Sequence, residues 1–593
     1  MKHLKTLLTA AMLLATGSAA AQAEGELVDV LPDGVTANVN PERKQDKQKN
    51  IVVAGSPEKG YRAFFAATDA EHGEELWVTD GTKEGTHIVS DIVPGSGSSD
   101  PSYLGRLNDK VLFAAYTDDW DVQAWVTDGT PEGTIMLTDY MFGARPVSFI
   151  QMDEKRAVFA AYDDESSEYD PDRGPQRWLW ITDGTVEGTK RVAKCDMRWP
   201  GQDNTTLHTA YVRVGRRVFF KADNIDGSTG EELWVTDGTE EGTYCVMDIN
   251  WERWPEGEWG YDEGYTRNCG LDNLENYKNE GCFFQAWTPD FGGEPWFTDG
   301  TKAVKANERD GAGDDHTYMV KDTHPGKNES GIGYHAGTFG ASWEVYKDRM
   351  WWRGWDATGG YELGGSNMQK DDYVFLDVWD EAPSIDNNSF VDPGCVFDGY
   401  YMFCAAHGFD AANENHYGGE LWCTDGEKVW PQYGNWRPGT TSDWVKEQVV
   451  AGGSMYWWNE ENIVESGYAT SLYRLDAWNA EPVVCTHIDM QKGDLVNTLR
   501  NMGGTIVFAS DATKHVYAYK YTKPGWDGKS DMGYLEPDFL TEAEKTAIQE
   551  INVSKLSNNN AIYDLQGRRI STDRLSGKVP GLFIQNGKKL IVK

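Results

Sequence analysis

The chain has 593 residues, of which 39% are hydrophobic, 12% aromatic and 25% charged, and this composition excludes a disordered chain. Its formal net charge is -40 at pH 7, a field that repels phosphate backbones, so we expect no nucleic-acid partner. After the N-terminal segment, no apolar run approaches the ~18 residues that span a bilayer, so we expect no membrane span.

The first 23 residues have the pattern of a secretory signal peptide. Lys2 and Lys5 precede an apolar run, and Ala21 and Ala23 are the small residues of a cleavage site. We therefore expect the mature chain to begin at Glu24 and to be exported, to the exterior or the outer-membrane surface of a Gram-negative bacterium.

Export would place the eight cysteines in an oxidising environment. Cys269 with Cys282, and Cys395 with Cys404, lie in neighbouring predicted strands and are the disulfides that we expect. Other connectivities stay open, because spacing alone does not fix them.

A phrase of the form ELWxTDGTxxGT recurs from residue 73 onward, which indicates a repeat architecture. Three decayed copies, at 349–378, 454–489 and 505–521, bring the count to nine units. In the six clear copies the tryptophan and the first aspartate are Trp77 and Asp80, Trp125 and Asp128, Trp180 and Asp183, Trp234 and Asp237, Trp296 and Asp299, and Trp422 and Asp425.

Each full unit reads as four short strands, A to D, parted by turn residues. Radially repeated four-stranded sheets are typical of a β-propeller, here of eight or nine blades spanning 24–521. The last unit lacks strand D, and residues 25–34 resemble the strand D region at 87–96. We expect this N-terminal segment to supply the missing strand and close the ring.

The repeated phrase has a structural explanation. Alternation places Trp77 and Thr79 on one face of strand C, where an indole can fill the space between blades; burying about 200 Å² of it is worth about 5 kcal/mol as an upper figure. Asp80 can accept backbone N–H bonds in the turn, and we expect Gly81 and Gly85 to adopt positive φ.

These residues resemble the ELWxxDGT, or hyalin-like, repeat proteins of bacterial exported proteins, over about residues 50 to 521. The resemblance implies a propeller fold and an exported location, and it implies no shared catalytic residues. Residues 561–593, after an expected linker at 522–560, resemble the C-terminal sorting domain of the type IX secretion pathway. That likeness implies a small β module that meets the secretion machinery, although the segment is shorter than a full sorting domain.

Long insertions at 163–177, 251–268 and 407–419 fall on the face that carries the D-to-A and B-to-C connections, while one at 302–316 falls on the opposite face. Binding groups concentrate on such loops, so the first face is the expected functional face. In the 251–268 loop, aromatic rings beside acceptors suit a carbohydrate or peptide ligand, although they could equally hold the loop against the propeller. The candidate ligand-binding residues are Trp251, Trp254, Trp259, Tyr261, Asp262 and Tyr265.

Motifs for zinc, redox and serine-hydrolase chemistry are absent, so no catalytic residue is assigned. No metal or cofactor is expected; Ca²⁺ at the acidic stretch 223–232 stays an alternative, although Ile225 stands where a ligand belongs. The sequence predicts an exported, non-catalytic propeller that binds or adheres to an extracellular glycan or protein. An extracellular polysaccharide-degrading enzyme and a structural envelope protein stay open.

Overall fold

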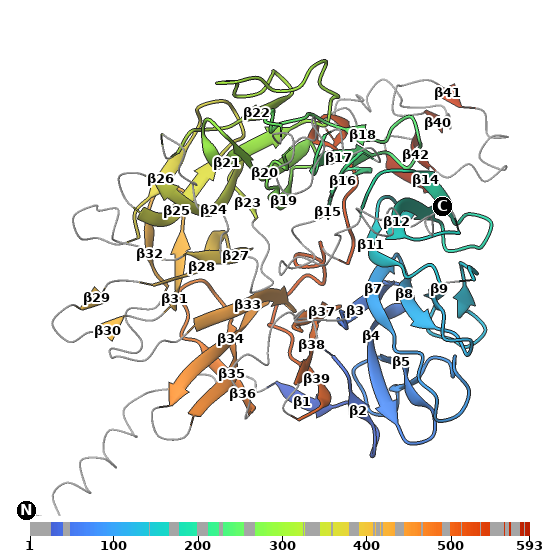
Figure 1. Cartoon of the computed structure of the whole chain (residues 1–593). Coiled ribbons are helices and arrows are strands. Elements are labelled where there is room, and N and C mark those ends of the chain that lie inside the picture. Colours follow the sequence, from blue (N-terminus) through green and yellow to red (C-terminus); the bar gives the residue numbers. More distant parts are fainter. Residues whose placement is uncertain are drawn as a thin grey trace, which may run out of the picture.

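In a computed structural model, the chain folds into a ring of nine antiparallel sheets in chain order (Figure 1). This confirms the predicted all-β propeller and selects nine blades over eight. A further small sheet follows at the C-terminus. The structure describes residues 25–39, 48–141, 143–164, 177–197, 211–224, 229–253, 267–323, 325, 344–356, 360–378, 389, 391–406, 409–410, 415–416, 419–432, 444–463, 467–488, 498–510, 513–533, 535–545, 562–563, 569–570, 581–585 and 588–592.

Strand A of each blade, which is β3 in blade 1 and β37 in blade 9, lies toward the centre of the ring, and strand D lies at its rim (Figure 1). Blade 1 has five strands, because β2 and β3 both pair with β4. Blades 1 to 3 are formed by β2 (Thr36–Ala37), β3 (Val52–Ser56), β4 (Gly60–Asp69), β5 (Gly73–Thr79) and β6 (His87–Ile88); β7 (Ser102–Leu107), β8 (Lys110–Tyr116), β9 (Val122–Thr127) and β10 (Ile135–Met136); and β11 (Val147–Gln151), β12 (Ala157–Ala161), β13 (Trp178–Thr182) and β14 (Lys190–Ala193).

The next three blades repeat the same order of four strands. They are β15 (Tyr211–Val214), β16 (Arg217–Ala222), β17 (Glu232–Thr236) and β18 (Tyr244–Cys245); β19 (Asp272–Tyr277), β20 (Gly281–Thr288), β21 (Gly292–Thr298) and β22 (Thr317–Met319); and β23 (Val345–Tyr346), β24 (Arg349–Asp356), β25 (Gly360–Ser366) and β26 (Val374–Leu376).

Blades 7 to 9 complete the ring, with a small hairpin of β29 and β30 inserted in blade 7. Their strands are β27 (Asp392–Phe397), β28 (Tyr400–Ala406), β29 (Phe409–Asp410), β30 (Asn415–His416), β31 (Gly419–Thr424) and β32 (Val429–Pro431); β33 (Trp444–Ala451), β34 (Ser454–Ile463), β35 (Gly467–Leu475) and β36 (Val483–Ile488); and β37 (Arg500–Met502), β38 (Thr505–Ser510), β39 (His515–Lys520) and β1 (Glu26–Asp29).

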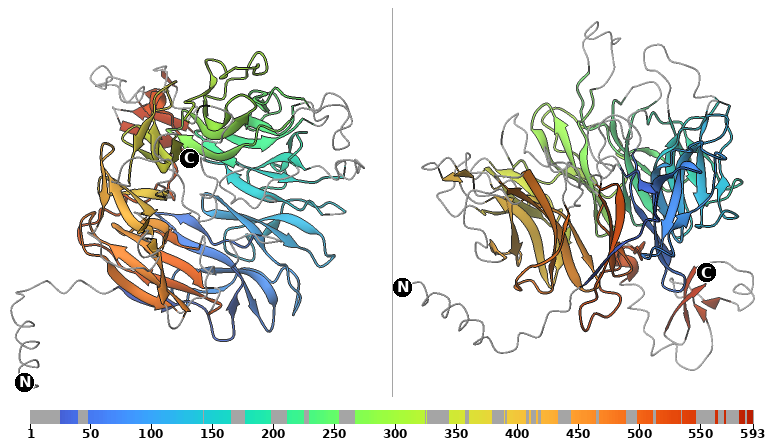
Figure 2. Two further views of the ribbon diagram at one scale, coloured as in Figure 1. Left: turned by 60° about the vertical axis from the view of Figure 1, so that its left-hand side comes forward. Right: turned by 90° about the horizontal axis from the view of Figure 1, so that it is seen from below.

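The N-terminal strand closes the ring, as the sequence predicts. β1 pairs antiparallel with β39, from Glu26 opposite Lys520 to Asp29 opposite Tyr517. The first and last blades therefore lie side by side, which both views of Figure 2 show. β1 thus gives blade 9 its fourth strand and covers the edge of β39, where another chain could otherwise add a strand.

The DGT turn forms the predicted hydrogen bonds, with one difference. Asp80 Oδ1 accepts from Thr82 N at 2.9 Å and from Thr82 Oγ1 at 2.6 Å. Gly81 has a φ of +88°, as expected. Gly85 does not adopt a positive φ; it is required because a Cβ there would lie 2.2 Å from Asp80 Oδ1. The carboxylate that closes the turn thus occupies the space of a side chain.

The repeated tryptophan packs against the preceding blade. Trp77 shares a buried cluster with Val507 and Ala518 of blade 9, and Trp296 shares one with Phe219 and Leu233 of blade 4. Each contact joins two blades, so the strand C tryptophans stabilise the ring rather than single sheets. The same relation holds for Trp125, Trp180, Trp234 and Trp422.

The glutamate of the ELW phrase is buried and holds the loop between strands D and A. Glu75 accepts from Val93 N and Ser99 N at 3.2 Å each, and Glu362 accepts from Val378 N at 2.9 Å and Ser389 N at 3.0 Å. Burial raises the pKa of Glu75 to about 7 and that of Glu362 to about 8. The D-to-A loops on the expected functional face are therefore tied to groups that titrate near neutral pH.

All eight cysteines are free, so neither predicted disulfide forms in this structure. The strand register gives the reason. Cys404 lies opposite Asp392, whereas Cys395 lies opposite Met402 across a register shift. Cys282 likewise lies opposite Asn276, and the backbone of Cys269 instead accepts a hydrogen bond from Trp287 N.

Residues 522–533 and 535–545, within the expected linker, lie against the ring on the face of the A-to-B turns. Met532 and Leu535 join the buried cluster of blades 1 and 9. Arg213 Nη1 of blade 4 donates to the Asp538 carbonyl at 3.1 Å, and Asn279 Nδ2 of blade 5 donates to the Leu540 carbonyl at 3.0 Å. The segment thus crosses from one side of the ring to the other before it ends in a helical turn at 542–545.

The C-terminal module is a four-stranded sheet in the order β41-β40-β42-β43. Its strands are β40 (Ile562–Tyr563), β41 (Arg569–Ile570), β42 (Gly581–Gln585) and β43 (Lys588–Val592). This confirms the expected small β module. No helix among the described residues has the length and hydropathy of a membrane span.

Candidate functional site

Of the six candidate ligand-binding residues in the 251–268 loop, the structure describes one, Trp251. Trp254, Trp259, Tyr261, Asp262 and Tyr265 lie outside the described residues.

Trp251, the one candidate residue that the structure describes, is half-buried and interacts with two neighbouring side chains. Its Nε1 donates to Asp290 Oδ2 at 3.3 Å, and the Arg309 guanidinium lies 5.0 Å from the centre of its ring. The interactions of Trp251 therefore match the alternative reading, in which the ring holds the loop in place.

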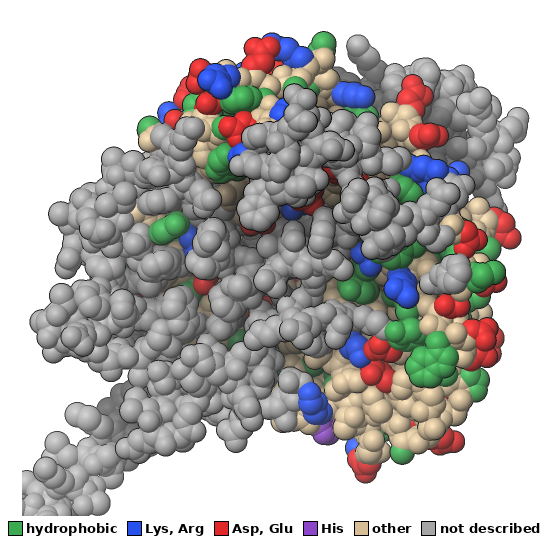
Figure 3. Space-filling view, in the orientation of Figure 1, with side chains coloured by type: hydrophobic (Ala, Val, Ile, Leu, Met, Phe, Trp, Pro, Cys, Tyr) green, Lys and Arg blue, Asp and Glu red, His purple; other side chains and the backbone are tan. Residues whose placement is uncertain are grey.

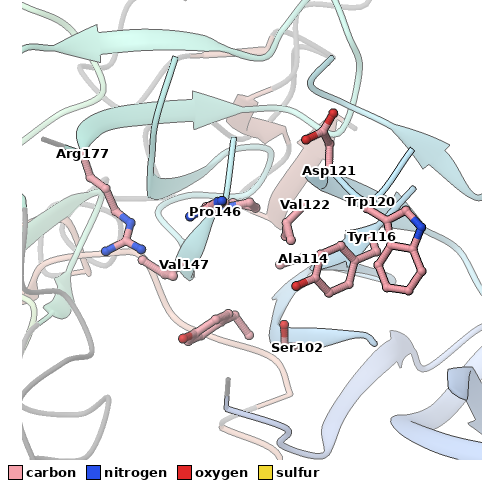
Figure 4. A pocket seen from close by; sticks show the side chains of 11 residues that line it. Ser102, Ala114, Tyr116, Trp120, Asp121, Val122, Pro146, Val147 and Arg177 are labelled. Carbon is pink, nitrogen blue, oxygen red and sulfur yellow. The ribbon is translucent and has the colours of Figure 1, made fainter. Parts of the chain in front are cut away.

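A pocket of about 290 Å³ lies between blades 2 and 3, on the face of the D-to-A and B-to-C loops (Figure 4). The pocket therefore lies on the face that the loop lengths indicate, but not at the 251–268 loop, where the candidate binding residues were expected. It is lined by Ser102, Tyr103, Ala114, Tyr116, Trp120, Asp121, Val122, Arg145, Pro146, Val147 and Arg177.

A β-bulge in each inner strand shapes the floor of the pocket. In β7, Ser102 pairs with Ala114 and the next pair is Gly105 with Leu112, so the backbone bends between them. Tyr103 in this bend has a φ of +53°. β11 has the equivalent bulge after Val147. Bulges redirect side chains, and these two occur where the inner strands meet the functional face.

The Ser102 hydroxyl at this floor is buried, with 1% of the residue exposed. Within the described part of the chain, its Oγ has no hydrogen-bond partner. A buried hydroxyl without a partner costs about 1 to 3 kcal/mol, so a water or a ligand atom is expected beside it.

Aromatic side chains form one wall. Trp120 is 79% exposed, and its ring lies edge-on to Tyr116 with the centroids 6.1 Å apart. A tight turn presents it, because Trp120 N donates to the Thr117 carbonyl and Thr117 N donates to the Asp121 carbonyl. Trp120 has a φ of +68°, which an L-residue rarely adopts without a constraint of this kind.

Arginines line the pocket as well, and Arg177 faces the aromatic wall across it in Figure 4. The Arg177 guanidinium stacks 4.7 Å from the ring centre of Tyr162. Arg145 is exposed, and no carboxylate among the described residues pairs with it. Its backbone N donates to the Val122 carbonyl at 2.9 Å, which fixes it beside strand β9.

The loop that carries Arg145 is held by Gln123, which stands where blades 1 and 6 have the buried Glu75 and Glu362. Gln123 Nε2 donates to the Tyr140 carbonyl at 2.8 Å, and its Oε1 accepts from Thr138 Oγ1 at 2.9 Å and Ala144 N at 3.3 Å. An amide does not titrate near neutral pH. The hydrogen bonds of Gln123 to this loop therefore do not change in the pH range in which Glu75 and Glu362 gain or lose a proton.

The pocket is electrostatically unusual for this chain. Among the described residues in Figure 3, Asp and Glu side chains lie along the upper and right-hand edges of the ring, in keeping with the net charge of -40. The pocket lining instead holds two arginines and one carboxylate, Asp121. The two arginines can pair with an anionic group of a ligand, while the exposed Asp118 and Asp119, in the turn that carries Trp120, add negative charge beside the pocket.

Loop length in the sequence does not point to this pocket, because the B-to-C loop that carries Trp120 is short. The signal that could have found it is Trp120, a tryptophan in a short B-to-C loop where the repeat needs none. The floor has no such signal, since a bulge depends on strand register.

No metal site emerges from the described residues, in which no three His, Cys, Asp or Glu side chains gather to hold an ion. The stretch considered for Ca²⁺ lies partly outside that set, because residues 225–228 are not described.

No family model matches this chain, and no curated protein matches it. Among solved structures, it is similar to the β-propeller domain of the Trilobed protease from Pyrococcus furiosus, with 10% identity, 74% of this chain and 98% of that chain covered, and a TM-score of 0.31. A Mycobacterium tuberculosis puromycin-hydrolyzing peptidase shows 12% identity over 70% of this chain and 58% of its own, with a TM-score of 0.31. Pyrococcus horikoshii acylaminoacyl peptidase shows 11% identity over 71% and 59%, with a TM-score of 0.27.

This chain spans little more than half the length of several peptidases that it matches. The expectation of a non-catalytic adhesion or glycan-binding protein is wrong by this comparison, because the similar structures include several peptidases that share a propeller. At these identities, the likeness shows the propeller fold alone.

Proposed function

We propose that the protein is a small-molecule-binding propeller, and that the pocket between blades 2 and 3 holds an organic carboxylate with a flat apolar part. The observation that carries this proposal is the combination of an exposed tryptophan, two arginines and an unpartnered buried hydroxyl in one cavity. Sites of this kind use apolar walls for affinity and a few polar groups for orientation.

The expected affinity is modest. Covering about 100 Å² of apolar surface on Trp120 contributes about 2.5 kcal/mol, and a charged hydrogen bond to Arg145 contributes about 2 kcal/mol. These contributions sum to about 4.5 kcal/mol, and association itself costs free energy, so we expect a dissociation constant of about 0.5 mM or weaker.

Calorimetric titration with 3-phenylpropionate, and with its neutral amide as the control ligand, tests this proposal. The acid should bind and the amide should bind at least about tenfold more weakly, because only the acid pairs with the arginines. Arg145→Gln and Trp120→Ala should each reduce binding of the acid. Lys305→Ala and Val304→Ala, which change exposed residues of blade 5 that do not line the pocket, are the matched controls and should bind as the wild type does. Equal binding of acid and amide would contradict the proposal.

We also propose that the chain is exported and that its C-terminal module serves secretion. Cleavage after Ala23 would leave β1 intact, and with it the closure of the ring. Mass spectrometry of the mature N-terminus tests the cleavage, and deletion of 561–593 followed by assay of the culture medium tests the module. An uncleaved chain, or unchanged secretion after the deletion, would refute the respective part.

A further inference from the structure

We infer that the natural ligand of this pocket is a zwitterion of amino-acid to dipeptide size, with its ammonium group on Asp121. The inference rests on the proposed function, which supplies only the carboxylate and the apolar part of the ligand. It adds a second charged group on the ligand, a second residue of the pocket that binds this group, and a limit on the size of the ligand.

The ammonium partner is the Asp121 carboxylate. Asp121 lines the pocket, and Figure 4 shows it on the side of Trp120, across the cavity from Arg177. Its backbone is fixed by the bond from Thr117 N, and no side chain of the described residues bonds to its carboxylate. The pocket therefore offers an acceptor-only group opposite a donor-only group, an arrangement that orients a ligand with charges of both signs.

The Ser102 hydroxyl supplies the polar contact at the floor. It can donate to a carboxylate or carbonyl oxygen and accept from an amine, and both kinds of group occur in amino acids and peptides. Because the hydroxyl is buried and unpartnered, a ligand that forms a hydrogen bond with it should bind more tightly than a ligand that leaves it unpaired.

The size of the cavity limits the ligand. Its volume of about 290 Å³ lies at the lower end of the ~300 to 1,000 Å³ range for small-molecule sites. Trp120 and Tyr116 can cover one flat side chain. An aromatic amino acid, or a dipeptide of small residues, fits these limits, whereas a long peptide would extend outside the pocket.

The test compares phenylalanine with 3-phenylpropionate, which is the same molecule without the amine, at pH 7. We expect wild type to bind phenylalanine at least about tenfold more tightly, because a charge-assisted bond to a carboxylate has about this effect. In Asp121→Asn, the preference should fall to about threefold or less, while 3-phenylpropionate binds at least as well as before. Ser102→Ala should weaken the binding of both ligands by a similar factor.

The outcomes separate this inference from the proposed function. If 3-phenylpropionate binds and phenylalanine binds no more tightly, the zwitterion inference fails and the carboxylate proposal stands. If the preference persists in Asp121→Asn, the amine is recognised elsewhere and the inference is wrong. If neither ligand binds wild type, both proposals fail. Circular dichroism of each variant checks that the fold is retained.

Discussion

Replacing Glu362 with glutamine should make the protein less sensitive to pH. Glu362 is fully buried, and its carboxyl accepts from Val378 N, Ser389 N and Ser389 Oγ. Burial raises the pKa from 4.5 to about 8 in spite of these bonds. The stabilising effect of the bound proton is fully present below about pH 4.5 and is lost as the pH rises through 8.

The magnitude follows from the size of the shift. At 1.36 kcal/mol per pKa unit, the folded state loses at most about 5 kcal/mol between pH 4.5 and 8 through this one group. In Glu362→Gln that loss should disappear, so the stabilities of wild type and variant should converge as the pH rises, and the variant becomes the more stable protein if the full loss is reached. At pH 5, the variant should be less stable by about 1 to 3 kcal/mol, because its amide leaves one backbone N–H without an acceptor.

Urea unfolding at pH 5, 6.5 and 8.5 measures these differences in the free energy of unfolding. Gln123→Glu is the matched control, because it adds a buried carboxyl to the one blade that has an amide, and it should make stability fall more steeply with pH. A pH dependence that is the same in wild type and Glu362→Gln would refute the reasoning and show that Glu362 is ionised in the fold at neutral pH.

Three further predictions concern stability. Trp296→Ala should lower the free energy of unfolding by about 3 to 5 kcal/mol in urea unfolding, since the indole is fully buried between blades 4 and 5; a change below about 1 kcal/mol would contradict this packing. Gly85→Ala should lower the melting temperature, because its Cβ would meet the Asp80 carboxylate, while Gly533→Ala, where no atom lies within 4 Å, should leave it unchanged; equal effects would contradict the turn geometry. A chain ending at residue 521 should melt at a lower temperature than one ending at 545, because Met532 and Leu535 leave the cluster of blades 1 and 9; identical melting would mean that the segment does not stabilise the ring.

The repeat made the fold predictable from the sequence. The strand C phrase marks the blades, Asp80 marks the turn, and the likeness of residues 25–34 to 87–96 identifies the closing strand. These are local patterns that recur, so one unit explains the others. Gly85 shows the limit, because the sequence suggests backbone freedom where the structure shows a close approach of Asp80.

The pocket was not predictable in the same way. Its members come from two blades, and their meeting depends on the bulge at Tyr103 and on the curvature of the ring, which no local pattern encodes. The path of 522–545 was hidden for a similar reason, because its partners Arg213 and Asn279 lie hundreds of residues away. A glutamate at the position of Glu75 recurs in four of the six clear copies of the motif, but the hydrogen bonds of Glu75 to the D-to-A loop required coordinates.

The most direct test of the account is a crystal structure of the protein grown with millimolar phenylalanine. The account predicts ligand density between Trp120 and Arg177, with the carboxylate toward the arginines and the amine within hydrogen-bond distance of Asp121. Phenylalanine bound elsewhere on the propeller, with this pocket holding only water, would contradict it.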